Sequence, residues 1–141
     1  MTKHRVEDLI SKATGATEII KSEVIQKLWS GHGEIVRYNL CSADRNSIIV
    51  KHIQLARQGQ HPRGWNNDLS HNRKLKSYEI ETNWYKKWAI SCDESSRIPH
   101  CLAIEADSDE TIIILEDLDA SGYPGRKNSV SMAEMKVCIS W

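Results

Sequence analysis

The stretch Ser47-Ile-Ile-Val-Lys-His-Ile53 is dominated by β-branched residues. Such side chains pack well on the pleated surface of a sheet, so this stretch predicts a strand. Lys51 interrupts the apolar run, and a charge is uncommon inside a strand of this type. It is either a lysine of an edge strand whose head reaches water, or a cation directed into a cleft. The flanking segments bear on that choice.

Upstream of residue 47, the pattern predicts a β-meander. Residues 34–41 alternate as a strand does, residues 19–29 are expected to be extended, and turn signals at 30–33 and 42–46 separate these segments. Residues 5–13 suit a short amphipathic helix that ends before Gly15.

Downstream, residues 58–67 contain Gly, Pro and Asn and are expected to form a loop. Asp68 is a candidate N-cap for a helix to about residue 88, with Leu75, Tyr78 and Tyr85 on one face and Trp84 and Trp88 beside them. The pattern then predicts two strands, at 98–106 and 111–115, separated by a turn at 107–110. A linker at 120–128 and a helix capped by Ser129 or Ser131 are expected after them. The order predicts an α+β fold, a five-stranded antiparallel sheet packed on one long helix.

Composition excludes several classes of protein. The 141-residue chain has 19 Lys and Arg against 19 Asp and Glu, whereas a protein held to nucleic acid by electrostatics is expected to be basic. No segment approaches the ~20 apolar residues of a membrane helix, and residues 1–8 lack the apolar core of a signal peptide. We therefore expect a cytoplasmic protein that binds neither nucleic acid nor membrane.

The four cysteines and six histidines show no spacing typical of a metal site or a disulfide framework. We expect reduced, mostly buried thiols and no metal ligands in this chain.

The turn Gly31-His32-Gly33 joins the first two predicted strands. Glycine allows a backbone to approach a phosphate closely and to present its N–H groups. The same pair of glycines is also common in ordinary hairpins, and the third glycine of the G-x-G-x-x-G pattern is missing here.

Glu81 follows Tyr78 by three residues and precedes Tyr85 by four, which places a carboxylate on the aromatic face of the long helix. A carboxylate there usually has a partner. The alternative is that Glu81 lies on the hydrated margin of the stripe; Glu79 competes for its role but lies further from the Tyr78–Tyr85 line.

The stretch Ile112-Ile-Ile-Leu-Glu-Asp-Leu118 opens from an apolar strand directly into acidic residues and then a Gly/Pro linker. This is typical of a hinge between two lobes, although a plain strand end with a solvated turn has the same pattern. The chain thus contains, in this order, a glycine turn, a lysine within a strand, a glutamate on a helix and a hinge. This is the order found in a protein-kinase-like N-lobe.

Five stretches extend this likeness to a particular family. They are Leu28–Arg37, Ile49–His52, His61–Trp65, Glu81–Tyr85 and Leu115–Asp119. Over most of residues 20–141 the chain resembles the N-terminal half of the choline-kinase/aminoglycoside-phosphotransferase-like family, and most closely the ecdysteroid-kinase-like (CHK-kinase-like) branch and its bacterial relatives. The Glu-Asp-Leu hinge and the Glu-x-x-aromatic-Tyr helix signature are its most specific parts.

The resemblance implies a role for each matching residue. Lys51 would hold the α- and β-phosphates of ATP, Glu81 would orient Lys51, and the turn at 31–33 (Gly31, His32, Gly33) would cover the phosphates. In the hinge, the Glu116 carbonyl and the Leu118 N–H would meet the adenine edge. The other two hinge residues are Leu115, in the gatekeeper place, and Asp117.

The resemblance also implies a division of the chain. Residues 1–119 would be the ATP-binding N-lobe, and residues 120–141 the hinge linker and first C-lobe helix. The catalytic Asp and the Mg²⁺ ligands have no counterpart here and are expected in a C-lobe beyond Trp141. The chain alone is therefore expected to be inactive, and the small-molecule hydroxyl acceptor is unknown.

Two alternatives stay open. One is a non-catalytic nucleotide-binding or pseudokinase-like module; the other is an α+β interaction domain in which Lys51 and Glu81 form a structural pair. The chain stops within its final predicted helix. We therefore expect that the 141 residues are part of a longer protein or an abrupt natural truncation. Its apolar residues Met132, Met135, Ile139 and Trp141 are expected to be exposed, or buried in a homodimer formed through this helix.

Overall fold

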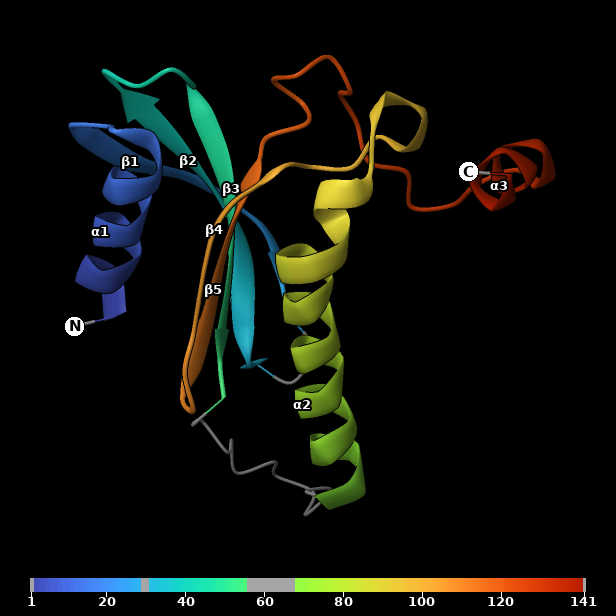
Figure 1. Cartoon of the computed structure of the whole chain (residues 1–141), viewed down its shortest axis with the longest axis horizontal. Helices are drawn as coiled ribbons and strands as arrows, with labels where there is room; N and C mark the ends of the chain where they lie inside the picture. The colour runs from blue at the N-terminus through green and yellow to red at the C-terminus, as the bar shows by residue number, and fades with distance from the viewer. Residues whose placement is uncertain (1, 29–30, 56–67, 141) are drawn as a thin grey trace.

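Three α-helices and five strands are the main elements of the described part of the chain, residues 2–28, 31–55 and 68–140 of the computed structural model (Figure 1). In chain order they are α1 (Thr2–Thr14), β1 (Glu18–Lys27), β2 (Gly33–Cys41), β3 (Ser47–Gln54), α2 (Asp68–Asn83), β4 (Cys101–Ala106), β5 (Glu110–Glu116) and α3 (Met132–Ile139). The loop predicted at 58–67, which contains the His61–Trp65 stretch, lies wholly outside the described residues.

The five strands form one antiparallel sheet in the order β1-β2-β3-β5-β4. The predicted α+β class, the five-stranded antiparallel sheet and the opening β-meander are confirmed. The strand β3 lies at the centre of the sheet, between β2 and β5. The interpretation of Lys51 as an edge-strand lysine is therefore wrong.

One face of the sheet is closed by α1, and the other faces α2 (Figure 1). In α1, Val6 and Ile10 are one helical turn apart, and both are buried with a set of strand residues: Leu40, Ile48, Val50, Ile112 and Ile114. The predicted helix at 5–13 is confirmed. Its place across the sheet was not predicted, and the expectation of a single helix packed on the sheet was incomplete.

Helical structure continues to Trp88, as predicted, but only the part to Asn83, helix α2, is α-helical. A π-helical turn, Trp84–Trp88, follows α2 and is closed by the Ala89 N–H donating to the Trp84 carbonyl. Tyr78 and Tyr85 are partly buried, as the stripe predicted. The extra residue in a π-turn rotates the side chains that follow it, and Trp88 is exposed.

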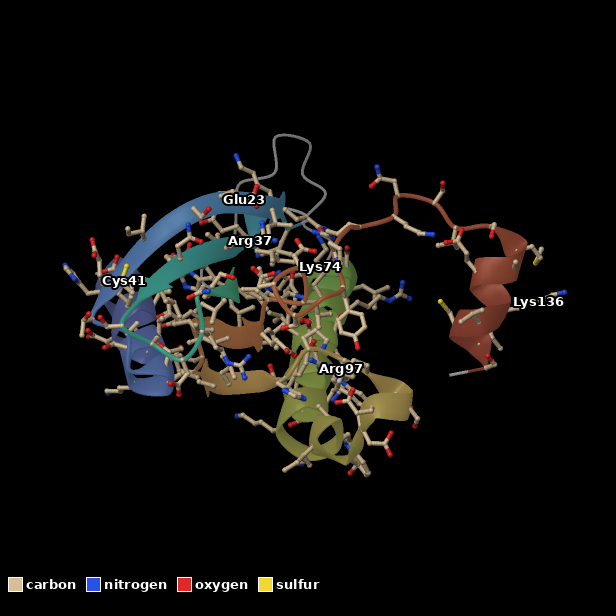
Figure 2. The ribbon with its side chains drawn as sticks, turned by 90° about the horizontal axis from the view of Figure 1, so that it is seen from above. Glu23, Arg37, Cys41, Lys74, Arg97 and Lys136 are labelled. Carbon is tan, nitrogen blue, oxygen red and sulfur yellow. The ribbon has the colours of Figure 1, made fainter. Side chains whose placement is uncertain are left out.

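The last helix, α3, stands apart from the sheet and from α2; Lys136 marks it in Figure 2. Ser131 caps it in a capping box with Glu134, which confirms one of the two predicted caps. Its apolar side chains are exposed: Met132, Met135, Val137 and Ile139. The exposure predicted for three of them is confirmed, and Trp141 lies outside the described residues. None of the helices in the described part of the chain is long and apolar enough to cross a membrane.

Candidate functional site

Lys51 and Glu81 form an ion pair between β3 and α2. The Lys51 Nζ lies 2.7 and 2.9 Å from the two carboxylate oxygens of Glu81. The two side chains are 16% and 29% exposed, so water screens the pair only in part. The predicted ion pair is confirmed, and Glu81 has the partner that its place on the aromatic face requires. The competing carboxylate, Glu79, is paired with Lys76 on the exposed side of α2.

The strand register shows what surrounds Lys51 on its face of the sheet. Gln26, Ile35, Lys51 and Ile113 stand directly opposite one another on β1, β2, β3 and β5 and form one cross-strand row. Because successive side chains alternate between the two faces of a sheet, the side chains of this row lie on the face that points away from the α1 core. Lys51 therefore belongs to the α2 face.

A second row on that face lies two residues nearer to the end of β5. It contains Glu23, Arg37, Ile49 and Leu115. The second row, together with Ile35 of the first, lines a pocket.

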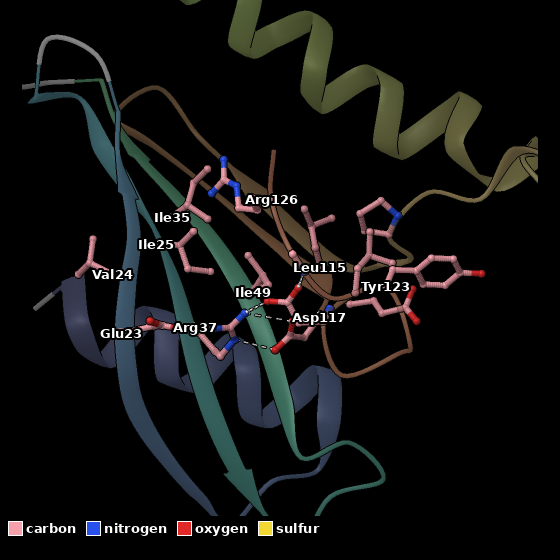
Figure 3. Close-up of a pocket in the computed structure, with 15 residues that line it drawn as sticks. Glu23, Val24, Ile25, Ile35, Arg37, Ile49, Leu115, Asp117, Tyr123 and Arg126 are labelled. Atoms are coloured by element: carbon pink, nitrogen blue, oxygen red, sulfur yellow. Dashed lines mark hydrogen bonds and ion pairs between the residues drawn. The ribbon is translucent and has the colours of Figure 1, made fainter. Parts of the chain in front are cut away.

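The pocket has a volume of about 490 Å³ (Figure 3). This is within the range of small-molecule sites, roughly 300–1,000 Å³. Its apolar floor consists of Ile25, Ile35, Ile49 and Leu115, and the chain from Glu116 to Asp119 closes one end. Lys51 is not among the lining residues. It lies just past the other end, directly across from Ile35.

Arg37 and three carboxylates form the acidic border of the pocket at the end of β5. The guanidinium Nε of Arg37 donates to Asp117 Oδ2 at 2.8 Å, and Nη2 donates to Asp119 Oδ2 at 2.5 Å. Glu23 pairs with the same guanidinium, and Ser47 Oγ donates to Asp117 at 2.8 Å. Burial alone would raise the pKa of Asp117, but the hydrogen bonds from Arg37 and Ser47 outweigh it and hold that pKa below its usual value.

Arg37 was missed as a functional candidate in the sequence. It stands inside a predicted strand, two residues from Ile35, as Lys51 stands two residues from Ile49. A second basic residue within an apolar strand was the signal that could have found it.

Glu116 is the other buried carboxylate of the segment predicted as a hinge. It accepts hydrogen bonds from Arg97 Nη2 at 2.6 Å, Ser121 Oγ at 2.7 Å and the His100 N–H at 3.1 Å. The side-chain hydrogen bond from Arg97 is the main cause that lowers the pKa of Glu116 to about 2. Glu116 and Asp117 are 5% and 4% exposed, whereas the turn that follows, residues 119–123, is exposed. Burial of the two carboxylates therefore does not separate a hinge from a plain strand end with a solvated turn.

The same contact accounts for the late start of β4. The predicted strand began at Ile98, but the backbone N–H of His100 bonds the Glu116 carboxylate and Pro99 has no N–H. Further along, the Leu118 carbonyl accepts from the N–H groups of Ser121 and Tyr123 at 3.1 and 2.9 Å and turns the chain back toward the pocket.

The turn Gly31-His32-Gly33 is not among the residues that line the pocket. Gly33 lies against β3, where a side chain would collide with the His52 carbonyl. His32 is buried, and its ring lies 5.9 Å from that of His71 in α2. Burial lowers the pKa of His32. The turn thus lies beyond Lys51, at the end of β3 away from the pocket, and Gly33 serves its close packing against β3.

The carboxylates nearest the pocket are already paired with arginines. Glu116 is held by Arg97, and Asp117 and Asp119 are held by Arg37, so their oxygens already serve as hydrogen-bond acceptors. Within residues 2–28, 31–55 and 68–140, no group of three or more His, Cys, Asp or Glu side chains could hold a metal ion. The described residues do not fit a Mg²⁺ site.

The four cysteines are free thiols, but the expectation that most are buried is wrong. Cys41 and Cys138 are exposed, whereas Cys92 and Cys101 are partly buried.

Comparison of the chain with protein-family models, with curated proteins and with solved structures finds no match. Any functional conclusion therefore depends on the geometry of the site.

Proposed function

We propose that this chain is the kinase-like ATP-binding lobe of a small-molecule phosphotransferase that acts on a hydroxyl group. One observation carries the proposal. The Lys51–Glu81 pair and the segment that leaves β5 stand at opposite ends of one apolar pocket, on one face of an antiparallel sheet. An adenine nucleotide has the matching polarity, with a flat apolar base at one end and phosphates at the other.

The charges around the pocket favour one orientation of the nucleotide. Three carboxylates surround Arg37 near the end of β5, so phosphates are repelled there. In this orientation the base lies on Ile49 and Leu115 and meets the backbone of Glu116 and Leu118. The phosphates extend toward Lys51, which Glu81 holds in place.

The chemical step needs groups that the resemblance assigns to a C-lobe. Mg²⁺ would neutralise the charge that develops on the transferred phosphoryl group, and a catalytic Asp would accept the proton of the acceptor hydroxyl. In this proposal residues 120–131 connect the lobes and α3 is the first C-lobe helix. The C-lobe would then cover the exposed apolar side chains of α3. The 141-residue chain by itself would bind ATP weakly and transfer nothing.

Calorimetric titration of the 141-residue chain with ATP tests the binding function. We expect weak binding that Lys51→Ala removes and that Lys76→Ala leaves unchanged, because Lys76 lies on the exposed side of α2. ATP binding that is indifferent to Lys51→Ala would contradict the assignment. Absence of ATP binding would favour the interaction domain, for which the exposed α3 is the supporting observation.

A kinase assay tests the catalytic part in a protein that joins this chain to a C-lobe. Lys51→Ala is expected to slow transfer by about 10²–10³, the effect of losing one preorganised charged contact. Lys51→Arg is expected to fail too, since a guanidinium fork does not replace a compact point charge. Glu81→Ala is expected to have a smaller effect because the lysine remains. Binding without any turnover in the joined protein would favour the pseudokinase-like alternative, and turnover by the 141-residue chain would show that the catalytic machinery had been misplaced.

A further inference from the structure

Arg126 follows β5 in sequence, yet its side chain reaches β1 across the pocket. Its Nη2 donates to Gln26 Oε1 at 2.8 Å, a contact between residues 100 apart in the chain. In Figure 3, Arg126 lies beside Ile35 and away from Arg37 and Asp117. It therefore stands at the end of the pocket opposite the acidic border.

The strand register relates Arg126 to Lys51. Gln26, which holds Arg126, is in the same cross-strand row as Ile35 and Lys51. Neighbouring strands lie about 4.8 Å apart, so the Cα atoms of Gln26 and Lys51 are separated by roughly 10 Å. The guanidinium of Arg126, held at Gln26, and the side chain of Lys51 thus lie on either side of Ile35.

The two arginines that line the pocket differ in their partners. Arg37 is surrounded by Glu23, Asp117 and Asp119, which neutralise its charge. The hydrogen bond of Arg126 goes to the uncharged amide of Gln26. A guanidinium bonds a phosphate more strongly than a neutral amide, because both charges contribute. Arg126 is therefore suited to exchange Gln26 for an anion.

We propose that Arg126 is a second phosphate ligand of this pocket. It binds the polyphosphate of a nucleoside di- or triphosphate from the β1 side, while Lys51 binds it from the β3 side. The inference rests on the proposed function and adds to it a residue delivered by the segment after β5. It also predicts that the pocket favours phosphorylated nucleotides over the bare nucleoside.

Calorimetry on the 141-residue chain tests the inference, with ATP, ADP and adenosine as probes. Arg126→Ala is expected to weaken ATP and ADP binding about tenfold, the effect of losing one hydrogen bond to a charged group, and to leave adenosine binding unchanged. Gln26→Ala is the matched control, because it removes the same hydrogen bond and keeps the cation. It is expected to leave ATP binding at least as strong as in the wild type.

The outcomes separate this inference from the function on which it rests. If Arg126→Ala and Gln26→Ala weaken ATP and adenosine binding equally, the contact only fastens the segment after β5 to the sheet, and the inference is overturned. If Lys51→Ala weakens ATP binding and Arg126→Ala does not, the nucleotide site stands and the inference alone fails. If the wild-type chain binds none of the three probes, both fail.

Discussion

The two faces of the sheet are formed by alternate residues of the same strands, and they serve different purposes. Toward α1, Ile48, Val50, Ile112 and Ile114 are at most 1% exposed and pack into one core. Toward the pocket, Ile49 and Leu115 are only partly buried and line open space. Because successive residues alternate, a strand can stabilise the fold with one set of side chains and leave the other set to a ligand.

The charged side chains are also distributed differently on the two faces. On the pocket face Lys51, Arg37 and Asp117 stand within the sheet or at its end, each with a partner. On the α1 side the ionic contacts lie at the edge of the core, where Arg5 bonds Glu105 and Asp107 of the β4–β5 hairpin. A pocket with an apolar floor and paired charges at or just past its two ends is suited to a ligand with apolar and charged parts, whereas the α1 core is suited to stability alone.

The largest loss of stability should come from a substitution in the core on the α1 face. Ile114→Ala removes a fully buried side chain and is expected to lower the free energy of unfolding by about 4 kcal/mol. Ile49→Ala, on the pocket face, should lower it by only about 1 kcal/mol and should weaken ATP binding. Urea unfolding of both variants measures the difference. Equal losses of stability would mean that the two faces do not differ as described.

Glu116 should give the next largest effect, through its buried ionic contacts. Its pKa of about 2 lies below the roughly 4.3 of an unfolded glutamate, so it stabilises the fold above about pH 5 and loses that contribution as the pH falls toward 2. Glu116→Gln should lower stability at pH 7 by on the order of 3 kcal/mol and flatten the acid dependence. Urea unfolding from pH 2 to 7, with the exposed Glu79→Gln as control, tests this; a wild-type acid profile in Glu116→Gln would refute it.

The Lys51–Glu81 pair should be worth less to stability, because it is partly exposed and is proposed to serve a ligand. A double-mutant cycle with Lys51→Met and Glu81→Gln is expected to give a coupling free energy of about 1 kcal/mol. The exposed Lys76–Glu79 pair should give about 0.3 kcal/mol. A coupling near 3 kcal/mol would instead favour the purely structural role that the interaction-domain alternative assigns to the pair.

The smallest effect should occur in α3, which belongs to neither face. Met135→Ser is expected to change the unfolding free energy by less than about 0.5 kcal/mol, because the side chain is exposed and away from the core. Hydrogen exchange should show weak protection after residue 119 and strong protection in the strands. Sedimentation on the same samples gives the oligomeric state. Strong protection in a monomer would contradict the two-lobe interpretation, and protection in a dimer would support a homodimer formed through α3.

Local patterns in the sequence determined most of the elements. The β-branched run at 47–53 and the isoleucines at 112–114 favour strands whatever their neighbours, and helical spacing put Tyr78, Glu81 and Tyr85 on one face. The Lys51–Glu81 pair could be predicted because a charge inside a strand and a carboxylate on an aromatic helix face both require partners.

Tertiary structure decided the rest. Local propensity acts over a few residues, whereas the insertion of β5 between β3 and β4 depends on how whole elements pack. That insertion brings Asp117 to Arg37 and returns Arg126 to Gln26. The position of α1 opposite α2 likewise follows from which face was left uncovered. The pocket exists only once these distant segments meet, so no local pattern in the sequence could outline it.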